Sequence, residues 1–375
     1  MKQALVRRKL ERVNRAVDRS VDKGEIPGAT ILAKLGDPLR YEGIFGSAAL
    51  TPSPRETRPD TLYDLASLTK VLATTSAIMT LVAEQKLALD QAIADVFPEF
   101  ALHGKEKVTV RHLLTHSSGL RPWRAYYEDL REREHRKGER LLGTPEGRRS
   151  IVRRIFQSVL VHEPEEAAVY GDLGFIVLGE LVERVSGEPL DTFCQSRVFA
   201  PLGMADTHFN RLPFTGDPTR YAATELCPWR ERVLVGEVHD GNAWAMGGVA
   251  GHAGLFSTAG DVLRFAEEML AADRGESELF PAEVAREFSR RQEIPPGSDW
   301  ALGWDTPSAE STSGRHFSRA SIGHTGFTGT SVWIDLERGA IVVVLANRVH
   351  SVAKRSRFEL RPLVHDLVME AFLAA

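Results

Sequence analysis

The chain has 375 residues, 43% of them hydrophobic and 26% charged, which is typical of a soluble globular protein with one large domain or two lobes. Its formal net charge of −4 gives no electrostatic reason to expect nucleic acid or an anionic membrane as a partner. The first twelve residues lack an apolar run and a small-residue cleavage site, and no stretch is apolar enough to span a bilayer. The sequence therefore predicts a cytoplasmic protein with no membrane partner.

The N-terminal part of the chain predicts a helix followed by a hairpin. Residues 2–23 carry an apolar stripe on a charged background, the pattern of an amphipathic helix. Residues 29–35 and 39–45 are predicted strands around a turn at 36–38. A polar loop over 51–59 then leads to residue 67, where a helix begins that is apolar on nearly all sides, as in a buried helix.

The middle of the chain is predicted to be mostly helical, and the end returns to strands. Helices are expected at 108–116, 145–161 and 173–185, and the mixed-charge run 128–140 indicates a solvated helix face or a mobile insertion. Cys194 and Cys227 lack metal-site spacing and are expected to be buried thiols. Strands are expected at 321–326, 330–336 and 340–347, before a last helix at 363–373.

These elements predict an α+β fold. An antiparallel sheet is built from both chain ends, residues 1–70 and 300–375, and carries flanking helices. Residues 71–299 form an inserted, mostly helical lobe, and the active site is expected at the interface between the two parts.

A serine and a lysine at the start of the buried helix carry the first chemical signal. Ser67 and Lys70 are three residues apart, which places both side chains on one helix face. A serine hydroxyl becomes a good nucleophile only when a neighbouring group takes its proton, and a lysine does so only if its pKa is lowered. The same spacing occurs at 20/23 and 351/354, but in charged or basic segments, so the apolar context singles out Ser67.

Two further motifs follow in order along the chain. The three motifs are Ser67-Leu68-Thr69-Lys70, Tyr170-Gly171-Asp172 and His324-Thr325-Gly326, supported by the phrases at 113–120 and 201–204. In this order they resemble the serine penicillin-recognising enzymes, in particular the group of class C β-lactamases, DD-peptidases and esterases of the same fold. The resemblance covers nearly the whole chain and implies the β-lactamase/transpeptidase-like version of the α+β fold.

The resemblance also implies roles for these residues. Ser67 would form an acyl-enzyme, with Lys70 or Tyr170 accepting its proton and Tyr170 then protonating the leaving group. The backbone N–H groups of Ser67 and Phe327 would form the oxyanion hole. The residues expected to bind substrate are Asp172, His324, Thr325, Gly326, Phe327 and His252, with Gly326 letting the ligand lie flat against the backbone. For His252, loop packing and substrate contact both stay open.

Two residues depart from the β-lactamase pattern. Asp172 replaces the usual asparagine, and its charge is expected to raise the pKa of Lys70 and to favour Tyr170 as the base. Asp172 is also a candidate N-cap for the helix from Leu173. His324 replaces the usual lysine, which predicts that recognition of a substrate carboxylate weakens as pH rises through about 6.5. Ordinary packing roles for Tyr170 and His324 also stay open.

The sequence therefore predicts a serine hydrolase that cleaves a small ester, amide or peptide with no cofactor and no metal, rather than an efficient β-lactamase. Two alternatives stay open: a penicillin-binding sensor or peptide-binding module that acylates without turnover, and a β-lactamase or DD-carboxypeptidase. His112 and His116 have the spacing of a zinc helix, but Leu113 stands where a metalloprotease has its glutamate, so a zinc hydrolase is disfavoured. The sequence does not predict the oligomeric state.

Overall fold

The computed structural model describes residues 2–36, 40–309, 311–351 and 358–374. Residues 37 and 38 of the predicted hairpin turn lie outside these ranges, as does Lys354 of the third Ser-x-x-Lys match.

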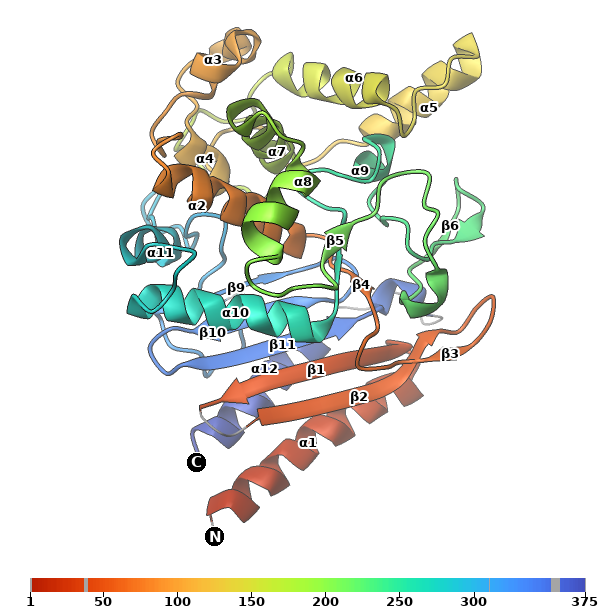
Figure 1. The fold of residues 1–375 in the computed structure, drawn as a ribbon, viewed down its shortest axis with the longest axis vertical. Helices are drawn as coiled ribbons and strands as arrows, with labels where there is room; N and C mark the ends of the chain where they lie inside the picture. The colour runs from red at the N-terminus through yellow and green to blue at the C-terminus, as the bar shows by residue number, and fades with distance from the viewer. Residues whose placement is uncertain (1, 37–39, 310, 352–357, 375) are drawn as a thin grey trace.

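A six-stranded antiparallel sheet joins the two ends of the chain (Figure 1). Its strand order is β3-β2-β1-β11-β10-β9. The strands are β1 (Gly28–Leu35), β2 (Arg40–Ala49), β3 (Arg55–Glu56), β9 (Ser321–Thr325), β10 (Ser331–Asp335) and β11 (Ala340–Ala346). The central pair, β1 and β11, runs in register from Ala29 opposite Ala346 to Leu35 opposite Ala340. The predicted sheet from both chain ends is therefore confirmed.

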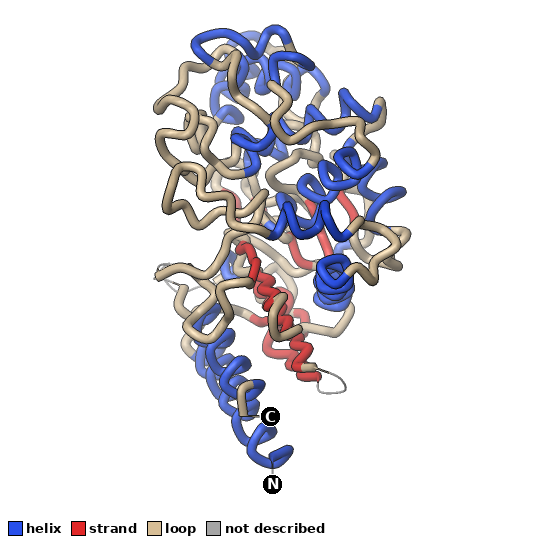
Figure 2. The backbone as a smooth tube through the Cα atoms, turned by 90° about the vertical axis from the view of Figure 1, so that its left-hand side faces the viewer, coloured by secondary structure: helices blue, strands red, loops and turns tan. Residues whose placement is uncertain are grey.

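Helices cover both faces of this sheet, which explains why β11 is apolar at nearly every position. The terminal helices α1 (Lys2–Asp22) and α12 (Leu360–Phe372) pack together on one face, and Val342 and Val344 contribute to the core there. Helix α10 (Ala259–Arg274) packs on the other face, where Val343 joins the larger core. In Figure 2 the strands separate the two terminal helices from the rest of the chain.

The rest of the chain is mostly helical. The helices are α2 (Ser76–Ala83), α3 (Ile93–Val96), α4 (Val110–Leu114), α5 (Tyr126–Lys137), α6 (Pro145–Phe156), α7 (Leu173–Ser186), α8 (Leu190–Cys194), α9 (Gly241–Ala245) and α11 (Ala282–Ser289). In the part of the chain that the structure describes, two segments are π-helical (Lys70–Thr75 and Gln195–Phe199), and three are 3₁₀-helical (Pro98–Gly104, Pro218–Arg220 and Arg348–His350). Short strands form a three-stranded sheet, β4 (Tyr63–Asp64), β8 (Leu255–Ser257) and β5 (His208–Phe209), and a pair, β6 (Leu226–Cys227) with β7 (Arg232–Val233).

Most predicted elements agree with this description. Helix α6 ends at Phe156, five residues before the predicted end, whereas α7 ends at Ser186, one residue after the predicted end. Gly187 follows it with a φ of 77°, which suits a glycine at the end of a helix. Cys194 and Cys227 are both buried free thiols. Because α10 belongs to the predicted helical lobe but packs on the sheet, the division into two lobes stays a prediction. Within the described ranges, no helix combines the length and the apolarity needed to cross a membrane.

The buried helix predicted from the sequence lies at the centre of the helical part. Every residue from Lys70 to Leu81 is buried, and α2 contacts α7, α8 and α11. This packing fixes the N-terminal end of the segment, where Ser67 lies.

Candidate active site

Ser67 follows a strained backbone turn that a buried carboxylate stabilises. Ala66 has a φ of 48°, in the left-handed region, which costs a residue with a Cβ about 1–2 kcal/mol. Asp64 accepts hydrogen bonds from the backbone N–H groups of Ala66, at 2.8 Å, and of His239, at 2.6 Å. These bonds hold the turn, so that Ser67 is presented at the start of the buried helix.

The amine of Lys70 forms hydrogen bonds with residues of both the first and the second motif. Its Nζ donates to Ser67 Oγ at 3.0 Å, to Tyr170 Oη at 2.9 Å and to Asp172 Oδ1 at 2.7 Å. A fourth, longer contact of 3.4 Å reaches the backbone carbonyl of His252. The lysine side chain is fully buried. Two segments about a hundred residues apart in the chain therefore meet at one cation.

The charge around Lys70 decides its protonation. Burial lowers the pKa of Lys70, but the charges and hydrogen bonds of Asp172 and Tyr170 outweigh that effect and raise the pKa above its ordinary value. A raised pKa keeps Lys70 in its ammonium form at neutral pH, and an ammonium has no lone pair to accept a proton. The predicted effect of Asp172 on Lys70 is confirmed, and it favours Tyr170 as the proton acceptor.

Replacing Asp172 with asparagine should destabilise the fold by about 3 kcal/mol at pH 7, because it leaves a fully buried ammonium without its counter-ion. An unfolded lysine has a pKa of about 10.4, and the folded pKa of Lys70 lies higher. The stability that the Lys70–Asp172 ion pair gives to the fold is then fully present below about pH 10.4, and it is lost as pH rises through the folded pKa of Lys70. Denaturant unfolding should show the full difference in free energy of unfolding between the two proteins at pH 7 and a smaller difference at pH 11. A gap that does not change with pH would rule out this explanation.

Tyr170 stands in an aromatic setting that leaves one side of its ring open. Trp300 stacks on it at 5.5 Å between ring centroids, and His116 and His324 pack against it at 4.8 and 5.7 Å. The side chain is nevertheless 40% exposed, so Tyr170 is not a core aromatic residue. Gly171 is needed beside it, because a Cβ there would lie 2.6 Å from Pro122 Cα.

A cavity of about 520 Å³ opens next to these side chains. It is lined by Ala66, Ser67, Trp123, Tyr127, Tyr170, Asp172, Glu225, Trp229, His239, Asp240, Gly241, His252, Ala253, Thr325, Gly326, Phe327, Arg348 and Arg361. All the predicted catalytic and substrate-binding residues are in this set except Lys70 and His324. Most of its aromatic side chains, and both arginines, were not predicted from the sequence.

Known proteins resemble this chain at the levels of sequence and structure. Residues 13–365 match the Beta-lactamase family. The chain belongs to the β-lactamase family. A relative from Escherichia coli (strain K12), named "Putative D-alanyl-D-alanine carboxypeptidase", is 32% identical over 375 residues, covering 92% of this chain and 83% of that protein. A relative of the same name from Salmonella agona (strain SL483) is 30% identical over 371 residues, with the same coverage.

Solved structures share the fold. EstCE1, described as a hydrolase with promiscuous acyltransferase activity, has a TM-score of 0.72 at 22% identity, covering 99% of both chains. An octameric penicillin-binding protein homologue from Pyrococcus abyssi has a TM-score of 0.72 at 23% identity, covering 96% of this chain and 76% of that one. At such identities the likeness establishes the fold alone. The predicted α+β, β-lactamase-like fold and membership of a serine hydrolase family are thus confirmed.

In this β-lactamase-family protein, His324 does not have the predicted properties. Only 3% of the residue is exposed, and burial, followed by the charge of Lys70, lowers the pKa of His324 to about 3. Its Nδ1–H donates to the carbonyl of Thr325 at 2.9 Å, and its ring packs on Tyr170 and Trp300. The expectation of a cation that reads carboxylates and titrates near pH 6.5 is therefore wrong, because burial keeps this imidazole neutral.

We expect the ratio of kcat/KM for a carboxylate-bearing substrate to that for a neutral ester to stay flat between pH 6 and 8. His324 is already neutral over this range, because its lowered pKa lies well below it, so no charge is lost there. The measurement is a pH profile of both substrates in the same buffers. A ratio that falls about tenfold through pH 6.5 would restore His324 as a carboxylate-binding cation.

One smaller expectation is also corrected, and another gains a structural reason. Asp172 stands at the N-cap position of α7, but its side chain makes no capping hydrogen bond, because Lys70 binds its carboxylate. At Gly326, a Cβ would lie 2.4 Å from the carbonyl oxygen of Leu65 and 2.1 Å from Thr330 Oγ1. Glycine there allows the chain after β9 to approach the Ser67 turn, and its expected role in letting a ligand lie flat stays a prediction.

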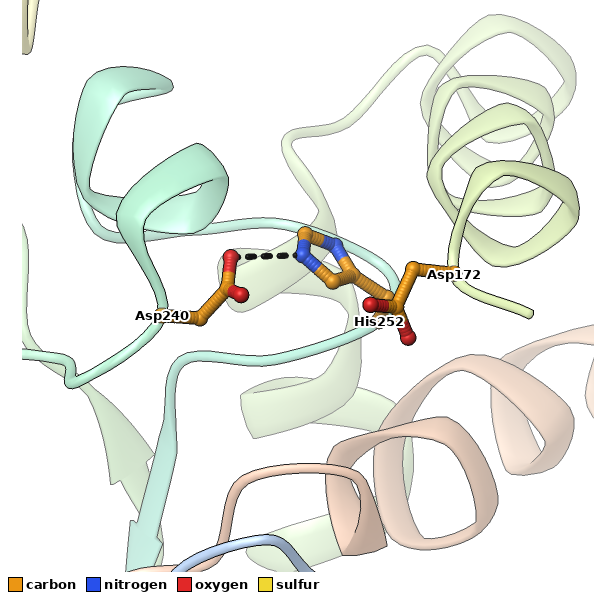
Figure 3. A group of neighbouring side chains, drawn as sticks. All are labelled: Asp172, Asp240 and His252. Carbon is orange, nitrogen blue, oxygen red and sulfur yellow. Dashed lines mark hydrogen bonds and ion pairs between the residues drawn. The ribbon is translucent and has the colours of Figure 1, made fainter. Parts of the chain in front are cut away.

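His252 belongs to a polar cluster that includes Asp240 and Asp172. Figure 3 shows its ring between the two carboxylates, with Nε2 bonded to Asp240 Oδ1 at 2.8 Å. One ligand atom from each residue lies within 4.8 Å of the others, as in a metal site. Asp240 also caps α9 through Ala243, however, and Asp172 binds the Lys70 ammonium, which would repel a metal ion. These bonds favour a hydrogen-bonded network over a metal centre.

The histidines of the possible zinc helix have other partners. His112 bonds Glu165 Oε1 at 2.8 Å through Nε2 and accepts the N–H of Thr109 at 3.2 Å through Nδ1. His116 instead accepts the N–H of Gly171 at 3.3 Å and supports Tyr170. His112 therefore takes part in capping the N-terminus of α4, and His116 belongs to the wall of the site. Neither histidine makes the contacts of a zinc ligand.

Proposed function

We propose that this protein is a serine hydrolase that forms an acyl-enzyme on Ser67 and cleaves a small ester, amide or peptide. The observation that carries the proposal is the convergence of Ser67, Tyr170 and Asp172 on the buried ammonium of Lys70. Ser67 lies at the wall of the cavity, where a substrate carbonyl can approach it. Membership of the β-lactamase family supports the same reaction class.

In the proposed mechanism, Ser67 Oγ attacks the carbonyl carbon and its proton passes to Tyr170 Oη. The Lys70 ammonium donates to that oxygen at 2.9 Å, and a cation in this position stabilises negative charge on the proton acceptor. The carbonyl oxygen becomes an oxyanion facing the backbone N–H groups of Ser67 and Phe327. Collapse of the tetrahedral intermediate breaks the bond to the leaving group, which takes the proton from Tyr170. Water then hydrolyses the acyl-enzyme by the reverse proton path.

The cavity supports a substrate with an apolar or aromatic part. Trp123 is 49% exposed and Phe327 is 54% exposed at the cavity, and Tyr127 and Trp229 add a stacked pair at 5.2 Å. Exposed aromatic side chains of this kind bind apolar groups. A D-alanyl peptide, as the names of the relatives suggest, is the second candidate substrate class. We also propose a cytoplasmic location, which fractionation of the source cells would test.

The test is a screen of the purified protein against p-nitrophenyl esters, D-amino-acid peptides, cell-wall muropeptides and a chromogenic cephalosporin. Steady turnover of esters or peptides, with weak cephalosporin hydrolysis, is expected. A single burst equal to the enzyme concentration would identify the non-turnover sensor instead. Fast cephalosporin hydrolysis would favour a β-lactamase.

A further inference from the structure

Arg361 extends from α12 to the turn that follows β9. Its Nη1 donates to two backbone carbonyls, of Gly326 and of Thr330, both at 3.0 Å. The residue is 8% exposed, yet it reaches the cavity beside Ser67. Burial lowers the pKa of Arg361 to about 10, so the guanidinium stays charged at neutral pH. Burying a charged group is costly unless it is well hydrogen-bonded. The Arg361 guanidinium makes its hydrogen bonds to two main-chain carbonyls.

The first of these carbonyls belongs to the peptide unit of the expected oxyanion hole. The carbonyl of Gly326 and the N–H of Phe327 lie in one planar group, and this peptide bond is trans. In a trans peptide the C=O and the N–H point in opposite directions. A donor that holds the carbonyl on one side therefore sets the direction of the N–H on the other.

The same turn is bonded directly to the Ser67 turn. Thr328 Oγ1 donates to the carbonyl of Asp64 at 2.7 Å, and Thr330 Oγ1 donates to the carbonyl of Leu65 at 3.0 Å. The two turns that carry the expected oxyanion donors are thus held side by side. Arg361 holds the second turn from the side of α12.

We propose that Arg361 is a positioning residue for the oxyanion hole, which aligns and polarises the Gly326–Phe327 peptide so that its N–H meets the oxyanion. A hydrogen bond from a charged donor is about twice as strong as a neutral one, and it polarises the group that accepts it. The inference rests on the proposed function, because it requires an oxyanion formed at Ser67. It adds to that mechanism a residue from the C-terminal helix that no motif includes.

A second use of Arg361 makes a different experimental prediction. Together with Arg348, which also lines the cavity, it would bind a carboxylate on the substrate. Carboxylate binding affects only carboxylate-bearing substrates and acts mainly on KM. Oxyanion positioning affects every substrate and acts on kcat, because the interaction strengthens in the transition state.

The test compares Arg361→Met and Arg361→Lys with the unaltered protein on a neutral ester. We expect kcat to fall about 10- to 100-fold in Arg361→Met, with KM within about threefold, since misplacing one oxyanion donor costs less than the 10²–10³ of losing it. Binding of an arylboronic acid, which forms a tetrahedral adduct with a serine hydroxyl, should weaken by the same factor as kcat. Arg361→Lys should keep part of the activity. A third variant, Arg361→Ala, is used for rescue: guanidinium ion at non-denaturing concentration should partly restore its kcat.

Lys105→Met is the matched control. Lys105 is also a buried cation and donates to two main-chain carbonyls, of Leu102 at 2.6 Å and of Ser158 at 2.5 Å, but it does not line the cavity. We expect kcat within about threefold and no rescue by guanidinium. An equal kcat loss in both variants would mean that a general packing defect explains the Arg361 result, and would overturn the proposal. A loss confined to carboxylate-bearing substrates, mainly in KM, would also overturn it. If the unaltered protein acquires no label on Ser67, the proposed function itself fails.

Discussion

Ser67→Ala should abolish turnover and all covalent labelling by a penicillin or a fluorophosphonate, while the protein stays folded. The alanine removes the only atom that can form the acyl bond in the proposed mechanism, and losing a serine nucleophile costs on the order of 10⁵-fold or more in kcat. The hydroxyl receives one hydrogen bond, from Lys70 at 3.0 Å, and Lys70 keeps its partners Tyr170 and Asp172. The free energy of unfolding should therefore change by no more than about 1 kcal/mol.

The chain supplies its own control in Ser20, which has the same spacing to a lysine. Ser20 Oγ donates to Glu25 at 2.6 Å and lies on α1, on the face of the sheet that carries α12. Ser20→Ala should leave labelling unchanged. Intact-mass and peptide mass spectrometry would locate the label. A label on any other serine, or a label that persists in Ser67→Ala, would end the assignment of the nucleophile.

Lys70→Ala and Tyr170→Phe should each lower kcat about 10²- to 10⁴-fold with little change in KM, because both are proposed to act in proton transfer. The Lys70 amine donates both to the Tyr170 phenol, at 2.9 Å, and to the Ser67 hydroxyl, at 3.0 Å, so the two groups are proposed to act as one unit. The double variant should lose little more than the worse single variant. Full kinetics of all four proteins give the comparison.

Stability has to be followed in the lysine variants, because Lys70→Ala leaves Asp172 without its counter-ion. Lys70→Met keeps the volume of the side chain. It should show the same kcat as Lys70→Ala if kcat falls because the amine is missing from the chemistry. Tyr41→Phe is the control for removing a tyrosine hydroxyl, since Tyr41 bonds Asn14 on α1. Losses in log kcat that simply add in the double variant would contradict the shared proton path.

The fold was largely predictable because its main elements have strong local patterns. The run 340–347 is apolar at nearly every position, which fits a strand that is covered on both faces. The amphipathic N-terminal helix and the buried helix after Lys70 followed from periodicity in the same way. The end of α6 was less predictable, since helix boundaries depend on a few weak interactions.

The site was predictable where motifs exist and not elsewhere. The convergence of Ser67, Lys70, Tyr170 and Asp172 agrees with the predicted constellation, although their catalytic roles stay predictions. His324 was misjudged, because the sequence does not reveal that Tyr170 and Trp300 cover it.

Some supporting residues had no sequence signal that identified their roles. Trp300 and Arg361 reach the site from segments without a motif. His116 lies in the Leu-Leu-Thr-His-Ser-Ser-Gly phrase, which could have identified it as a residue near the site. Contacts of this kind are made only after distant segments have packed.

The pairing of β1 with β11 affects how the protein is synthesised. Ala29 has to wait for Ala346, 317 positions later, before their strands can pair, so the central sheet cannot close until the ribosome has made β11. The turn after β9 is made long after Ser67, and Arg361 comes later still. A nascent chain thus carries Ser67 and Lys70 while the segment of the second proposed oxyanion donor is still missing. Under the proposed mechanism, catalytic competence would then arise only after β9, β11 and α12 have been made.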